Sequence, residues 1–122
     1  MATRDEIVAT CDQYLALLSK GDADGIVALY APDAVVEDPI GSPPKNGTEE
    51  IRAFYAAVSG TTLTATRIGP VTVVGNEAAF LFRIDVPLGE ETLSMASTDL
   101  MSFNDEGKVV KMTAYADGEA RP

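Results

Sequence analysis

The hydrophobic period of the chain changes near Gly60, and this change limits the folds open to it. Before Gly60 the apolar residues recur at helical spacing, as in the stripe formed by Ile7, Cys11 and Tyr14. After Gly60 apolar and polar residues alternate, which is typical of strands with one buried face. Helices followed by strands predict an α+β fold with an antiparallel sheet. The length suits a single domain over residues 1–122.

Three helices are expected in the first half of the chain. The first covers 4–20, and Gly21 suits the left-handed position after a helix. Asp22 is of a residue type that caps helices, so we expect it to begin a short second helix that includes Tyr30. Thr48 is expected to cap a third helix in the same way. Between these helices the sequence predicts a short strand at 35–38 and a loop at 39–47.

Five strands are expected after Gly60, at 62–68, 71–75, 77–87, 90–104 and 108–116. One face of the resulting sheet is strongly apolar and would pack on the helices. The opposite face also holds apolar residues and few charges, namely Ala79, Leu81, Ala96, Thr98 and Leu100. Because such a face is unfavourable in water, we expect a second copy of the chain to cover it, giving a homodimer.

Composition excludes several function classes. The chain has no His and one Cys, which argues against a catalytic imidazole, a metal centre and an internal disulfide. Its net charge of −10, with scattered Lys and Arg, argues against nucleic acid and anionic membrane partners. No apolar run is long enough to span a bilayer. We therefore expect a cytoplasmic protein that needs no metal or cofactor.

Asp99 breaks the pattern of its predicted strand. Alternation places it in a row of core-facing residues with Leu93, Met95, Ser97, Met101 and Phe103. Burial of an isolated carboxylate raises its pKa, so that Asp99 would stay neutral and donate a hydrogen bond. The alternatives are a β-bulge that turns Asp99 to solvent, or a structural hydrogen bond.

Two further polar side chains are candidates for a site. Tyr14 lies near the centre of the first apolar stripe, so its hydroxyl needs a buried partner, and Tyr30 and Tyr55 could supply one. Asp38 shares a strand face with Val36 and precedes a proline. The alternative for Tyr14 is a structural tyrosine of the core, and the alternative for Asp38 is an exposed acidic residue without a functional role. Together, one carboxylate and two neutral donors suit proton abstraction next to a carbonyl group.

Four segments carry a resemblance to a known family. They are Gly21–Tyr30, Asp33–Pro39 with its Val-Glu-Asp-Pro, Ile51–Tyr55, and Thr98–Val109 with the sequence TDLMSFNDEGKV. In this order they resemble the bacterial steroid Δ-isomerases (ketosteroid isomerases), over about residues 5–116, within a larger fold family similar to nuclear transport factor 2. The resemblance implies a conical α+β barrel of three helices on a curved mixed sheet, assembled as a homodimer.

The same resemblance implies roles for individual residues. Asp38 would be the general base, Tyr14 and Asp99 the oxyanion-hole donors, and Tyr30 and Tyr55 an extension of their hydrogen-bond network. A carboxylic acid kept neutral by its site is a known property of this enzyme class. Residues expected to contact an apolar substrate are Phe54, Phe82, Met101 and Met112. Ala116 departs from the family, because some members have a bulky aromatic residue there.

The expected reaction is conversion of a 3-oxo-Δ5-steroid to the conjugated 3-oxo-Δ4-steroid by proton transfer from C4 to C6 through a dienolate. Two alternatives remain open from the sequence. One is a polyketide cyclase-like or dehydratase-like enzyme on the same fold, acting on another apolar ketone. The other is a non-catalytic small-molecule binding or dimerisation module, because fold analogy alone does not assign function.

Overall fold

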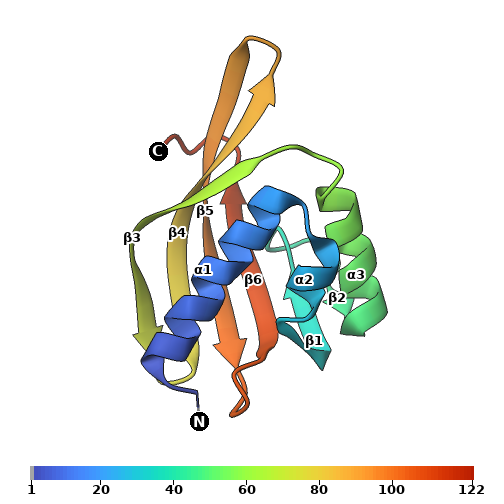
Figure 1. The fold of residues 1–122 in the computed structure, drawn as a ribbon, viewed down its shortest axis with the longest axis vertical. Helices are drawn as coiled ribbons and strands as arrows, with labels where there is room; N and C mark the ends of the chain where they lie inside the picture. The colour runs from blue at the N-terminus through green and yellow to red at the C-terminus, as the bar shows by residue number, and fades with distance from the viewer. Residues whose placement is uncertain (1) are drawn as a thin grey trace.

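The expected change from helices to strands is present in the computed structural model, which describes residues 2–122 (Figure 1). Two helices and two short strands precede a third helix, and four long strands follow it. The elements are α1 (Arg4–Lys20), α2 (Ala23–Val27), β1 (Tyr30–Glu37), β2 (Lys45–Asn46), α3 (Gly47–Val58), β3 (Thr64–Val74), β4 (Glu77–Leu88), β5 (Glu91–Phe103) and β6 (Val109–Asp117). The α+β class and the three helices are thus confirmed.

The first helix begins and ends where its sequence predicts, and the second helix begins where expected but ends earlier, at Val27. Thr3 forms a capping box with Glu6 at the start of α1, and Gly21 ends that helix with φ of 69°. The Asp22 side chain accepts a hydrogen bond from the Gly25 backbone and so caps α2. The third helix begins earlier than expected, because its N-cap is Asn46 rather than Thr48.

The six strands form one curved sheet in the order β2-β1-β6-β5-β4-β3. Every neighbouring pair is antiparallel except β1 and β6, which run parallel, so the sheet is mixed as expected. Strands β2 and β3 remain at its two edges, so the sheet curves without closing into a barrel. All three helices lie against one face, and the β4–β5 hairpin extends beyond them (Figure 1).

Three element assignments from the sequence are wrong. The loop expected at 39–47 contains the short strand β2 at Lys45–Asn46, which pairs with β1. Tyr30 begins β1 instead of ending a helix, because it pairs with Val109 of β6, and this distant pairing outweighs the helical spacing around it. The two strands expected at 62–68 and 71–75 are one strand, β3 (Thr64–Val74), whose register shifts between Ile68 and Thr72.

A single core lies between the helices and the inner face of the sheet. It contains residues of both halves of the chain, and its large fully buried side chains include Tyr14, Tyr55, Phe80, Ile7 and Ile51. The outer face of the sheet remains apolar and exposed in this single chain. Its exposed apolar side chains include Ile68, Val74, Leu81, Leu100 and Tyr115.

Candidate active site

The three residues that the sequence singled out lie around one cavity. Tyr14 comes from α1, Asp38 follows the end of β1, and Asp99 lies in the middle of β5. The cavity has a volume of about 80 Å³. Most of its other lining residues are apolar: Leu18, Val58, Leu63, Phe82, Ile84 and Ala116, with Tyr55 and Ser97 as the further polar ones. A small apolar cavity therefore holds two carboxyl groups and two phenols.

Three tyrosine hydroxyls form a chain of hydrogen bonds behind the cavity. The Tyr30 and Tyr55 hydroxyls are 2.7 Å apart, and those of Tyr55 and Tyr14 are 3.1 Å apart. Both expected partners of Tyr14 are thus connected to it, one through the other. Burial is the main reason that the pKa of each phenol lies well above its usual range. All three consequently stay protonated and available as donors.

Asp99 is buried among apolar neighbours on the inner face of the sheet. Its cross-strand partners are Phe80 and Ala114, and only 1% of its surface is exposed. The pKa of Asp99 is raised to about 8, mainly by burial and then by the negative charge of Asp38. A hydrogen bond from Ser97 acts in the opposite direction and lowers this pKa. Asp99 is therefore mostly neutral at pH 7. The alternative in which a bulge turns it to solvent is wrong, because the register is regular from Glu77 to Leu88 opposite it.

Asp38 has a different environment from Asp99. It is only half-buried, and it follows Val36, which is fully buried on the same strand. Burial raises the pKa of Asp38, but the positive charge of Lys45 opposes this rise. When the two carboxyl groups compete for one proton, the more deeply buried Asp99 takes it first. Asp38 is thus the carboxyl group that stays ionised longer, and an ionised carboxylate at a cavity can accept a proton.

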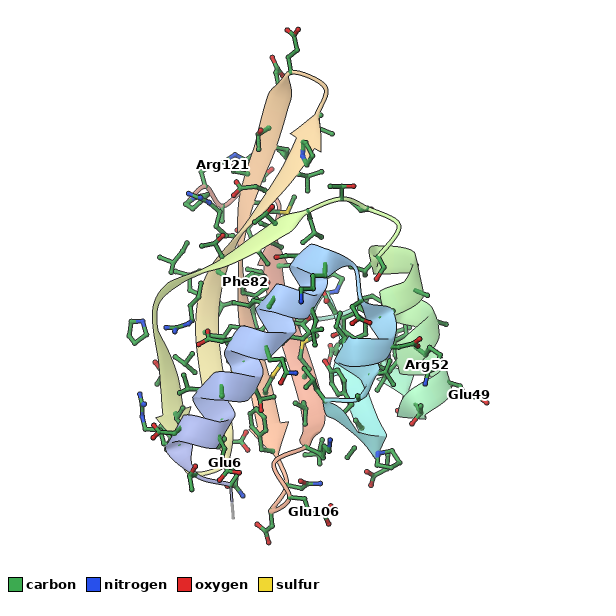
Figure 2. The ribbon with its side chains drawn as sticks, in the orientation of Figure 1. Glu6, Glu49, Arg52, Phe82, Glu106 and Arg121 are labelled. Atoms are coloured by element: carbon green, nitrogen blue, oxygen red, sulfur yellow. The ribbon has the colours of Figure 1, made fainter. Side chains whose placement is uncertain are left out.

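Of the four residues expected to contact an apolar ligand, one lines the cavity and three do not. Phe82 lines the cavity and projects from β4 on the side of the sheet that α1 covers (Figure 2). Phe54 does not line it, but packs edge-on against Tyr55 with ring centroids 5.0 Å apart. Met101 and Met112 are paired across β5 and β6 and lie in the core.

Several cavity residues were not expected from the sequence. Leu18 lies on the first apolar stripe and Ser97 shares the face of Asp99, so periodicity placed both near the site without assigning them a role. Val58 and Ile84 lie on the apolar faces of α3 and β4, and Leu63 lies in the connection between α3 and β3. Periodicity does not report that these three residues meet at one cavity. Ala116 also lines the cavity, so the family departure noted in the sequence falls at the site.

The described part of the chain has neither a cluster of three candidate metal ligands nor a membrane-crossing helix. Within residues 2–122 no three His, Cys, Asp or Glu side chains gather in a way that could hold a metal. In the same range no helix is long and apolar enough to cross a bilayer.

Comparison with known proteins shows the family and the fold of the chain. Residues 11–112 match the model of the SnoaL-like domain family. A steroid Δ-isomerase of Nocardioides simplex is 34% identical over 110 residues, which cover 90% of this chain and 89% of that protein. The solved structure of the epoxide hydrolase/cyclase-like enzyme SalBIII, which has a role in pyran ring formation in the polyether salinomycin, superposes with a TM-score of 0.85. It is 19% identical, and the match covers 96% of this chain and 95% of the other, so it supports the fold alone. The chain therefore belongs both to the SnoaL-like domain family and to the family of the steroid Δ-isomerases, and it is an isomerase.

Proposed function

We propose that the protein converts 3-oxo-Δ5-steroids to 3-oxo-Δ4-steroids. The observation that carries this proposal is one apolar cavity lined by the carboxyl groups of Asp38 and Asp99 and by Tyr14. The deeper burial of Asp99 favours the proton on Asp99 and the negative charge on Asp38, while Tyr14 stays protonated. The similarity to a protein named steroid Δ-isomerase supports the same reaction class.

Each group has one task in the proposed reaction. Asp38 removes a proton from C4, and the electron pair of the broken C–H bond moves into a dienolate whose negative charge develops on the C3 oxygen. Tyr14 and Asp99 donate hydrogen bonds to that oxygen. Asp38 then returns the proton to C6, so the product is an isomer of the substrate and no other reactant is consumed. Donors of this kind are each worth about 100- to 1,000-fold in turnover.

The size of the cavity limits how a steroid binds. Its volume of about 80 Å³ is below the roughly 300–1,000 Å³ of pockets that enclose drug-sized ligands. We propose that only the reacting ring enters it, beside Phe82, and that the remaining rings lie along the β4–β5 hairpin. The inner face of that hairpin carries the half-buried side chains Ile84, Val86, Leu93 and Met95. Contacts from Phe54, Met101 and Met112 with the substrate stay predictions of the family resemblance.

Two properties of the whole protein are part of the proposal. The apolar outer face of the sheet suits a second copy of the chain, so a homodimer is expected. A cytoplasmic location stays a prediction from the sequence, which fractionation of the source cells would test.

The test is ultraviolet absorbance after mixing the purified protein with 5-androstene-3,17-dione, with Asp38→Asn as the control. We expect a conjugated enone to form rapidly with the wild type and not with the variant, while both bind a phenolic steroid. If folded wild type forms no product but binds the phenolic steroid, a cyclase-like or dehydratase-like enzyme with another ketone substrate is favoured. If it binds neither compound, the non-catalytic module is favoured.

A further inference from the structure

We propose that Ser97 is a positioning residue, which holds the Asp99 carboxyl group so that Oδ2 carries the acidic proton and presents it to the cavity. This inference rests on the proposed function, because it concerns the donor that stabilises the dienolate. Nothing in the family resemblance assigns a role to Ser97.

The geometry of β5 places the two side chains together. Ser97 and Asp99 are two residues apart on one strand, so both point to the inner face, and both line the cavity. The Ser97 hydroxyl donates a hydrogen bond of 3.0 Å to Oδ1 of Asp99. Both residues are at least 98% buried, so water does not compete freely for this bond.

No other described residue can hold the carboxyl group in the same way. The neighbours of Asp99 on the inner face are Phe80 and Ala114 across the ladder and Met101 along the strand, and none has a polar side-chain hydrogen to donate. The Tyr14 hydroxyl is bonded to Tyr55. Within residues 2–122, Ser97 is the only hydrogen-bond partner of the Asp99 side chain.

This single bond determines where the proton of a neutral Asp99 resides. Oδ1 accepts the Ser97 hydrogen and so is the poorer site for a proton of its own. The acidic hydrogen is consequently on Oδ2, the oxygen left free to donate to a ligand. Without Ser97 the carboxyl group could rotate, and the donor would spend less time in the productive orientation.

Among the groups that face Asp99, only Ser97 lowers the pKa of its carboxyl group. The other groups come from α1, α3, β1 and the residue that follows β1, and are Cys11, Tyr14, Tyr55, Tyr30 and Asp38. None of them is a cation. The Ser97 hydroxyl binds the ionised carboxylate more strongly than the neutral acid, so it lowers the pKa of Asp99, whereas burial and Asp38 raise it.

The first experiment follows the ionisation of Asp99 without any turnover. The ¹³C carboxyl resonance of Asp99 is titrated in ligand-free protein and assigned by its loss in Asp99→Asn. We expect Ser97→Ala to move the midpoint upward by about half a unit to one unit. Ser97→Thr, which keeps a hydroxyl, should stay near the wild type, and Ser97→Cys, a weaker donor, should lie between them.

A matched control tests whether any loss of a serine hydroxyl on β5 has this effect. Ser102 is on the same strand and also donates to a carboxylate, Oε1 of Glu77 at 2.7 Å, but on the exposed face. Ser102→Ala should leave the Asp99 midpoint unchanged. An unchanged or lower midpoint in Ser97→Ala, or an equal rise in Ser102→Ala, would overturn the proposal. If Ser97→Ala does not fold, the titration of Ser97→Cys replaces it: a midpoint above that of the wild type supports the proposal, and an unchanged or lower midpoint overturns it.

The second experiment measures turnover against pH. In Ser97→Ala we expect kcat near neutral pH to fall about threefold to tenfold, because the donor is less well oriented. The alkaline limb of the profile should also move to higher pH, since Asp99 keeps its proton longer. A purely structural role would lower activity without moving this limb. If the wild type isomerises no steroid, the proposed function fails, while the titration still judges the Ser97–Asp99 pair.

Discussion

Tyr14 lines the cavity, and its hydroxyl lies 3.1 Å from the Tyr55 hydroxyl, which is itself 2.7 Å from that of Tyr30. Tyr55 is therefore the middle member of the chain and is bonded on both sides, whereas Tyr14 is the end member that lines the cavity. Loss of a terminal hydroxyl removes one hydrogen bond, whereas loss of the central one removes two. Loss of the Tyr14 hydroxyl should consequently affect catalysis more, and loss of the Tyr55 hydroxyl should affect stability more.

We predict opposite rankings for Tyr14→Phe and Tyr55→Phe. Tyr14→Phe should reduce kcat at least ~10-fold, because it removes an oxyanion donor, and should cost about 1 kcal/mol of unfolding free energy. Tyr55→Phe should reduce kcat less, but should cost about 2 kcal/mol or more, because it leaves two buried hydroxyls without their partner. Steady-state kinetics and urea unfolding of both variants measure the two rankings. Equal kinetic losses would remove the special role given to Tyr14.

Asp99 should be tested as a neutral donor with two substitutions. Asp99→Ala removes the donor and should lower kcat at least ~10-fold. Asp99→Asn keeps an N–H that can donate, so it should retain more activity than the alanine variant. The kcat values of both variants in one buffer series measure this order, and the reverse order would contradict the role of Asp99 as a hydrogen-bond donor.

The sequence predicted the burial of Asp99 and Tyr14 correctly, because each is a polar residue at a position where strict alternation or helical spacing leaves no other face for it. Tyr30 shows the limit of such reasoning. Its spacing from Ile26 fits a helix, but the pairing of Tyr30 with Val109, 79 positions along the chain, places it in a strand. Local patterns do not report long-range pairing, so the order of the strands and the parallel contact of β1 with β6 required the structure.

The cavity shows a similar limit. Alternation identified the inner face of β4 and β5, but it could not separate Phe82, which lines the cavity, from Met101, which lies in the core. Both residues are apolar and point inward. The difference depends on the distance between the helices and the curved sheet at each position, and no sequence period measures that distance.

The free energy of unfolding should depend on pH through Asp99. Its pKa is about 8 in the folded chain and about 3.9 in an unfolded one. Between these values the folded state binds more protons, so stability falls as pH rises, by at most about 1.4 kcal/mol per pH unit. The stabilisation is complete below about pH 4 and lost above the folded pKa.

Asp99→Asn provides the measurement of this effect, because it deletes the titration and keeps the shape of the side chain. Urea unfolding at pH 5, 6, 7 and 8 should show the wild type losing stability relative to the variant at each step. Parallel curves for the two proteins would mean that Asp99 titrates alike in both states, contrary to its burial.

The outer face of the sheet should hold two copies of the chain together. Leu81 and Leu100 are each 39% exposed on that face, on adjacent strands with no charge between them. A charge at this place would have to be buried without a partner in a dimer, so Leu100→Glu should weaken association strongly. Analytical ultracentrifugation of the wild type should give a dimer, and that of the variant mainly a monomer. Ala9→Glu, which adds the same charge on the exposed side of α1, should remain dimeric. A wild-type monomer at micromolar concentration would show that this apolar face is not a dimer interface.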